Sequence, residues 1–159
     1  MAIVDLVETM RERNDCKVLS PEGVPVVNLA LPLDLKEFYG LCGGAVLFEE
    51  ADYSITIVPP DEFRRANPVI IGQDCSDDIS FDWFVVGKSE GDYITIDLND
   101  SRLGRCYDSF HETHGVVGEC RILALTFESL LDQLIKGQGE YWYWLQDDFE
   151  FLGDAYDDV

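Results

Sequence analysis

The sequence predicts a protein that combines α-helices and β-strands in separate parts of the chain. Near the N-terminus and near residue 130, apolar residues recur with the 3.6-residue period of an amphipathic helix. Between about residues 45 and 107, they alternate with the two-residue period of strands. At 159 residues, 47% of them apolar, the chain suits one globular domain over 1–159, with an acidic, aromatic C-terminal segment from about residue 138.

Two helices are expected before the strands. Residues 2–14 place one apolar stripe on a helical face, made of Ile3, Leu6, Val7 and Met10. A second helix follows Leu31-Pro32 and repeats the spacing with Leu35, Phe38, Tyr39 and Cys42. Proline suits the first turn of a helix, and we expect the Gly43-Gly44 pair to end it, because glycine adopts the left-handed conformation at no steric cost.

The middle of the chain is predicted to form strands and loops. Strands are expected at 45–48, 53–58, 81–86, 93–98 and 104–107, with a short helix that begins with residues 61–63 and a polar, acidic loop at 73–80. Residues 121–125 lead into a last helix over 126–136, for which Thr126 is the expected N-cap and Gly137 the expected C-terminal stop. Its apolar stripe predicts that this helix packs on the sheet.

Gly87-Lys88-Ser89-Glu90-Gly91 fits the G-x-S-x-G pattern of a hydrolase nucleophile elbow and also resembles the end of a phosphate-binding loop. An elbow needs a helix after the serine, and here a strand pattern follows. A phosphate-binding loop needs a glycine five residues before Gly87, where the chain has Asp82. We therefore predict a β-hairpin, with no catalytic role for Ser89.

No other motif gives a complete catalytic or metal site. His111-Glu-Thr-His114 is one residue too short for the zinc-protease signature, and its spacing with Cys106 and Asp108 matches no common zinc site. The segment from Asp97 lacks the glycine and glutamate of a calcium-binding EF-hand. We expect no metal and no cofactor, although the sequence leaves zinc binding around Cys106, His111 and His114 open.

Charge and cysteine content limit the partners and the compartment. The formal net charge is −21, which disfavours nucleic acid and anionic membranes as partners and favours a basic protein, although the charge also serves solubility. Five cysteines without C-x-x-C spacing indicate free thiols. Because the N-terminus shows no basic region and no long apolar run, we expect a cytoplasmic protein.

Three segments resemble the SUKH superfamily (Smi1/Knr4-like). "LPLDLKEFYGLCGGAVLF" resembles its Leu-Pro-led opening helix, "DWFVVGKSEGDYITIDLN" its central hairpin, and "ILALTFESLLDQLIKG" its closing helix. Trp83, Gly87, Gly91, Asp97 and Phe127 occupy positions of that pattern. The resemblance covers about residues 30–137 and implies an α+β fold, in which a central, mostly antiparallel β-sheet is covered by α-helices.

The resemblance also implies a function. Many bacterial members look like immunity proteins, which bind and neutralise a cognate toxin, often a nuclease and hence basic, whereas fungal relatives are regulators. We therefore expect a non-catalytic toxin inhibitor whose contacts are acids in predicted loops and tail aromatics: Glu49, Glu50, Asp52, Asp74, Asp77, Asp78, Trp142, Trp144, Asp147 and Asp148. A regulatory or scaffold module, a nucleic-acid mimic and a small metal-dependent enzyme are the alternatives.

Overall fold

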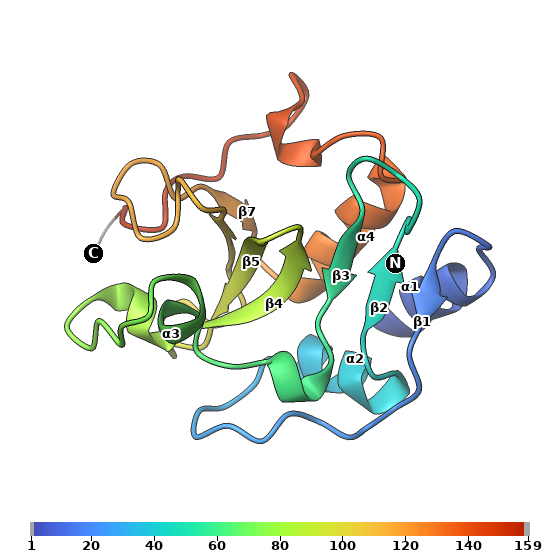
Figure 1. The fold of residues 1–159 in the computed structure, drawn as a ribbon, viewed down its shortest axis with the longest axis horizontal. Helices are drawn as coiled ribbons and strands as arrows, with labels where there is room; N and C mark the ends of the chain where they lie inside the picture. Colours follow the sequence, from blue (N-terminus) through green and yellow to red (C-terminus); the bar gives the residue numbers. More distant parts are fainter. Residues whose placement is uncertain (1, 158–159) are drawn as a thin grey trace.

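The computed structural model describes residues 2–157, and its centre is an antiparallel sheet (Figure 1). Seven strands within these residues pair in sequence order, each antiparallel to the next. They are β1 (Lys17–Val18), β2 (Ala45–Leu47), β3 (Ile55–Ile57), β4 (Trp83–Ser89), β5 (Asp92–Asp97), β6 (Cys106–Ser109) and β7 (Ile122–Ala124). The expected α+β fold with an antiparallel sheet is therefore confirmed.

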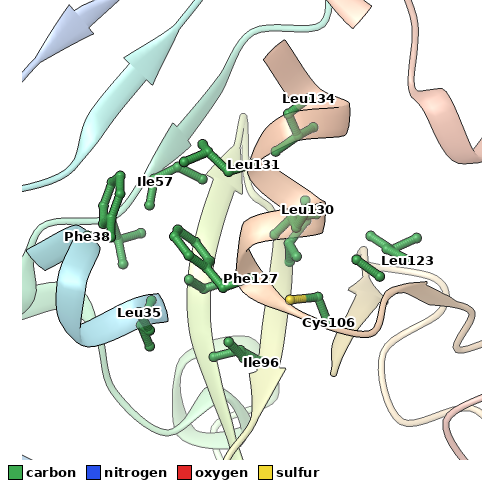
Figure 2. Close-up of a cluster of buried hydrophobic side chains, with 14 of the residues drawn as sticks. Leu35, Phe38, Ile57, Ile96, Cys106, Leu123, Phe127, Leu130, Leu131 and Leu134 are labelled. Atoms are coloured by element: carbon green, nitrogen blue, oxygen red, sulfur yellow. The ribbon is translucent and has the colours of Figure 1, made fainter. Parts of the chain in front are cut away.

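Three helices, α1 (Ile3–Arg11), α2 (Leu33–Leu41) and α4 (Phe127–Gly137), pack together over one face of the sheet. Figure 2 shows how α4 directs its apolar stripe at the strands and at α2. Phe127 lies between them, with its ring centroid 5.0 Å from that of Phe38. The stripe of α4 is buried as the sequence predicts, at Phe127, Leu130, Leu131 and Leu134. No helix among residues 2–157 combines the length and the apolar character that crossing a membrane requires.

The other face of the sheet is covered by short elements and loops. These include α3 (Ala66–Ile70) and the 3₁₀ turn η2 (Ile79–Asp82), which contact each other. Two further 3₁₀ turns, η1 (Pro60–Glu62) and η3 (Tyr143–Leu145), follow β3 and α4 in the chain. Trp83 of β4 is fully buried on this face, with its ring 4.4 Å from that of Tyr107 and 5.8 Å from that of His114. The sheet is therefore enclosed on both sides along β4 to β6.

The hairpin prediction is confirmed, with a shift of its boundaries. β4 and β5 pair from Trp83 to Ser89, so Gly87 lies inside the strand, next to a bulge, rather than in the loop. The turn is Glu90-Gly91, and both residues have positive φ (+51° and +99°), as a type I′ turn requires. The Ser89 hydroxyl donates to the carbonyl oxygen of Ser54 at 2.8 Å, which is a structural bond.

Of the two predicted ends of α4, the N-cap is confirmed and the C-terminal stop is wrong. Thr126 is the N-cap, and its hydroxyl oxygen accepts from the Ser129 backbone N–H at 3.1 Å. Gly137 is not the stop, because it lies within the helix and Gln138 takes the left-handed conformation with φ of +52°. The next glycine, Gly139, serves packing: a Cβ there would lie 2.7 Å from side-chain carbons of the β2–β3 loop.

The Gly43-Gly44 pair follows α2 as expected, but sterics explain it better than helix termination. A Cβ on Gly43 would lie 2.2 Å from the carbonyl oxygen of Ser20, and one on Gly44 would lie 2.6 Å from that of Ile57. Only backbone without side chains fits between these two segments. The pair therefore lets the end of α2 approach Ser20, which follows β1, and Ile57 in β3.

Candidate functional site

The acidic C-terminal segment, residues 138–157, forms an ordered band across the molecule. In Figure 1 it runs from the end of α4 over η3 to the loop between β6 and β7. The Tyr143 hydroxyl donates to the carbonyl oxygen of Leu123 at 2.6 Å, and the Ala155 N–H donates to that of Cys120 at 2.8 Å. These bonds fix the tail beside the edge strand β7.

Two of the predicted contact residues, Trp142 and Trp144, pack mainly against aromatic rings of the protein itself. The rings of Trp142 and Trp144 stack at 5.1 Å with an interplanar angle of 13°, and both meet the edge of Phe110. Trp144 is only 2% exposed and Trp142 is half-buried. Trp144 therefore offers almost no surface to a partner, whereas Trp142 offers part of its ring.

The β2–β3 loop packs against the start of the tail. The Tyr53 N–H donates to the carbonyl oxygen of Gly139 at 3.2 Å, and the Tyr53 ring lies edge-on to that of Trp142 at 5.2 Å. The loop carries three predicted contact acids, Glu49, Glu50 and Asp52, all of them exposed. These carboxylates therefore gather at the end of the sheet where the tail begins.

A hollow of about 300 Å³ extends this acidic region toward the β4–β5 turn. Its lining includes Glu49, Asp52 and Glu90, and its one basic residue is Lys88. The Lys88 ammonium is held by Glu62 at 2.6 Å, so the three lining carboxylates have no ion pair within residues 2–157. We call Glu49, Glu50, Asp52 and Glu90 the acidic end of the sheet.

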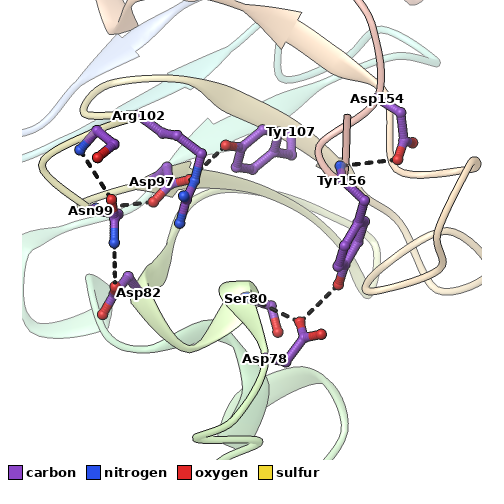
Figure 3. A network of polar contacts seen from close by, with 10 residues as sticks. Asp78, Ser80, Asp82, Asp97, Asn99, Arg102, Tyr107, Asp154 and Tyr156 are labelled. Carbon is purple, nitrogen blue, oxygen red and sulfur yellow. Dashed lines mark hydrogen bonds and ion pairs between the residues drawn. The ribbon is translucent and has the colours of Figure 1, made fainter. Parts of the chain in front are cut away.

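The acidic loop at 73–80 lies elsewhere, beside α3 on the other side of the molecule (Figure 1). Asp74 and Asp77 are exposed there. The carboxylate of Asp78 instead holds the fold together, because it accepts from the Ser80 N–H at 3.0 Å and from the Tyr156 hydroxyl at 2.8 Å, as Figure 3 shows. Partial burial raises the pKa of Asp78, but these hydrogen bonds outweigh burial and keep the pKa below its usual value.

The ten predicted contact residues thus form separate groups. Glu49, Glu50, Asp52 and Trp142 lie together, whereas Asp74, Asp77 and Asp78 lie apart from them. Asp147 and Asp148 are exposed on the tail, and Asp148 lines a groove of about 530 Å³ between the tail and α4. Their role as contacts stays a prediction.

Sequence reasoning missed the exposed apolar residues that lie among these acids. Leu125 at the end of β7, Tyr141, Leu145 and Phe151 are 52%, 40%, 61% and 67% exposed. The sequence places Leu125 only in the segment that leads into the last helix, and nothing in the tail pattern separates exposed from buried aromatics. Glu90 is also absent from the predicted set, although its place in a two-residue turn requires its exposure.

The cysteine and histidine side chains of the described residues do not gather into a metal site. Among residues 2–157 no three histidine, cysteine, aspartate or glutamate side chains form a group that could hold a metal ion. His111 is exposed, whereas the His114 ring lies inside and bonds Asn67. Burial raises the pKa of the Cys120 thiol to about 12 and that of Cys106 well above its usual value, so neither forms a ready thiolate.

Fold and surface together define a class: an α+β scaffold with a closed core and an acidic, partly aromatic surface suited to binding another macromolecule. Comparison with known proteins places the chain more narrowly. Residues 26–133 match the model of the SMI1 / KNR4 family (SUKH-1), and the chain belongs to this family. It is also 48% identical over 162 aligned residues to Immunity protein YokJ of Bacillus subtilis (strain 168), covering 100% of this chain and 98% of that protein.

Proposed function

We propose that this protein is an immunity protein, which binds and neutralises a cognate bacterial toxin without catalysing a reaction. The observation that carries the proposal is the similarity to Immunity protein YokJ, which extends over the whole chain, tail included. Family membership alone is a weaker argument, since one fold hosts many functions. The surface described above supports a binding role independently.

The charge distribution supports a basic toxin surface, as in a nuclease that must hold phosphates. The chain has 32 acidic and 11 basic residues. Six ion pairs within residues 2–157 use six of the basic residues, which the acidic residues already outnumber. Most carboxylates therefore remain free to attract a positive partner and to speed encounter. The same charge disfavours nucleic acid or an anionic membrane as the ligand.

Association kinetics with the toxin encoded by a neighbouring gene test this proposal. We expect the association rate constant to fall steeply as salt rises, because attraction between exposed charges is screened beyond about 8 Å at physiological ionic strength. The variant Glu50→Gln/Asp52→Asn removes two charges at the acidic end, and Asp74→Asn/Asp77→Asn removes two at the other acidic loop. If the acidic end is the contact, only the first pair slows association, by about two- to tenfold at low salt.

The outcome can contradict the proposal in two ways. A neighbouring toxin that is neither bound nor inhibited removes the immunity role. Binding at a rate that ionic strength does not change leaves that role in place and removes the electrostatic account. If the second pair of variants slows association instead, the contact lies near α3.

A further inference from the structure

A second hollow, of about 430 Å³, lies between the β6–β7 loop and the tail. Its wall contains four acids and a single basic residue, Arg121; the acids are Asp108, Glu112, Glu119 and Asp154. Two exposed apolar side chains, Leu145 and Phe151, complete the wall. Its volume is many times that of one water molecule, about 30 Å³ in the liquid, so a side chain fits. We call this hollow the acidic pocket.

One carboxylate oxygen in the wall is buried without a hydrogen-bond partner. Asp154 is 7% exposed, and its Oδ2 accepts from the N–H groups of Gly118 and Tyr156, both at 3.0 Å (the second is drawn in Figure 3). Its Oδ1 has no partner among residues 2–157. A buried acceptor left unpaired is unfavourable, so a donor that reaches it stabilises the bound state.

Arg121 does not supply that donor. Its backbone forms a bridge with Asp154, which puts the two residues side by side. Its guanidinium turns away, donates to the carbonyl oxygen of Trp144 and lies 6.0 Å from the centre of the Phe151 ring. In the described part of the chain, no ion pair within 4 Å joins Arg121 to a carboxylate of the pocket. The four acids therefore keep their net attraction for a cation.

The pocket also holds a carboxyl that a cation would stabilise. Burial raises the pKa of Asp108, although hydrogen bonds from Phe110 and Thr113 and the charge of Arg121 oppose this. Asp108 and Glu112 also line a neighbouring hollow with Asp92, so the negative charge continues beyond the pocket mouth. A cation entering here meets carboxylates from the β6–β7 loop on one side and from the tail on the other.

We propose that the acidic pocket binds a guanidinium group, the side chain of an arginine on a protein partner. A guanidinium presents several donors in one plane, which suits carboxylates from two walls, and its face stacks on an aromatic ring such as the 67% exposed Phe151. Leu145 offers apolar surface to the aliphatic stem. The proposal rests on the proposed function, because it names a feature of the same basic partner, but the pocket is testable without that partner.

The test titrates the whole protein with N-acetyl-L-arginine amide and follows backbone amide signals by NMR. Saturable shifts are expected at Gly118 and Tyr156, whose N–H groups bond Asp154. Glu112→Gln and Glu119→Gln, both at exposed positions, are expected to weaken binding about three- to tenfold. Asp100→Asn, an equal charge change at an exposed position outside the pocket, is the control and leaves the affinity unchanged. Asp154→Asn tests the buried oxygen, with a folding check because Asp154 also anchors two loops.

Three results overturn the proposal. Shifts that never saturate, or that survive in the glutamate variants, mean diffuse attraction to an acidic surface. Equal binding of N-acetyl-L-lysine amide means a general cation site. The absence of shifts at Gly118 and Tyr156 means that Arg121 or water already donates hydrogen bonds to the carboxylates of the pocket. If the probe binds but the neighbouring toxin does not, the proposed function fails and the pocket stands; if the toxin binds but the probe does not, the reverse holds.

Discussion

Replacing His114 by glutamine is expected to remove one defined component of the loss of stability at acidic pH. The ring is 8% exposed, and its Nε2 lies 2.7 Å from Oδ1 of Asn67. Because the Asn67 amide group donates to Ser80 and to the Asp74 carbonyl, its oxygen faces His114, so Nε2 is the donor and carries the proton. Nδ1 is buried and has no partner among residues 2–157. A second proton would therefore have no acceptor there.

Burial lowers the pKa of His114 to about 4, although the charge of Asp78 favours the protonated ring. In the unfolded chain a histidine titrates near 6.5. A depressed pKa in the folded state means that only the unfolded chain takes up this proton between pH 6.5 and 4. His114 therefore does not change the free energy of unfolding above pH 6.5. As the pH falls below this value, the protein loses stability, by about 2 kcal/mol at pH 5 and about 3 kcal/mol below pH 4.

Urea unfolding of the wild type and His114→Gln at pH 7.5 and pH 5 measures this effect. Carboxylates shared by both proteins cancel in the difference, so the cost of the substitution is expected to shrink by about 2 kcal/mol on acidification. His111→Gln, which replaces the exposed histidine, is the control and should keep the wild-type profile. A cost of His114→Gln that is equal at both pH values refutes the assignment of the buried neutral ring.

The remaining predictions concern the scaffold. Gly139→Ala is expected to destabilise the protein by about 2 kcal/mol or more, because φ of +71° and the 2.7 Å contacts both oppose a Cβ, whereas Gly23→Ala, with φ of +89° and open space, should cost about 1 kcal/mol. Asp97→Ala is expected to cost about 3–5 kcal/mol, because it strands the largely buried Arg102, whose Nε donates to Asp97 at 2.9 Å. Lys136→Ala breaks an exposed ion pair and should cost under about 1 kcal/mol. Chemical denaturation measures all four, and equal costs within either pair contradict the reasoning.

Local patterns explain which parts of the fold are predictable. The apolar stripe of α4 and the alternating pattern of β4 and β5 each lie within one continuous segment, so hydrophobic periodicity predicts them. β1 has only two residues, Lys17–Val18, and α3 contains Pro68 in its first turn, so neither gives a usable period. The prediction of Gly137 as the helix stop is wrong because the left-handed residue that ends α4 is Gln138, which the preference of this conformation for glycine does not predict.

The candidate surface is predictable in composition but not in arrangement. Charge and turn patterns identify exposed acids such as Glu49, Asp52 and Asp77, because a carboxylate is rarely buried alone. Their grouping depends on long-range contacts such as Tyr53 with Gly139, which no local pattern encodes. The sequence predicts Trp144 as a contact, yet stacking on Trp142 and an edge-to-face contact with Phe110 leave it almost fully buried. The acidic pocket joins residues from β6 to the tail and has no signature within one segment.

A net charge of −21 has opposite consequences for folding and for binding. Carboxylates that repel one another weaken the compact state, and most remain unpaired because the chain has 32 acidic and only 11 basic residues. The same unpaired charges would attract the basic partner that we propose. The ion pair between the fully buried Asp97 and the largely buried Arg102 escapes this conflict, since its charges are satisfied within the scaffold. Added salt should therefore stabilise the free protein by screening repulsion while it slows association. For the toxin inhibitor that we propose, the same unpaired charges would speed capture and lower the stability of the free protein.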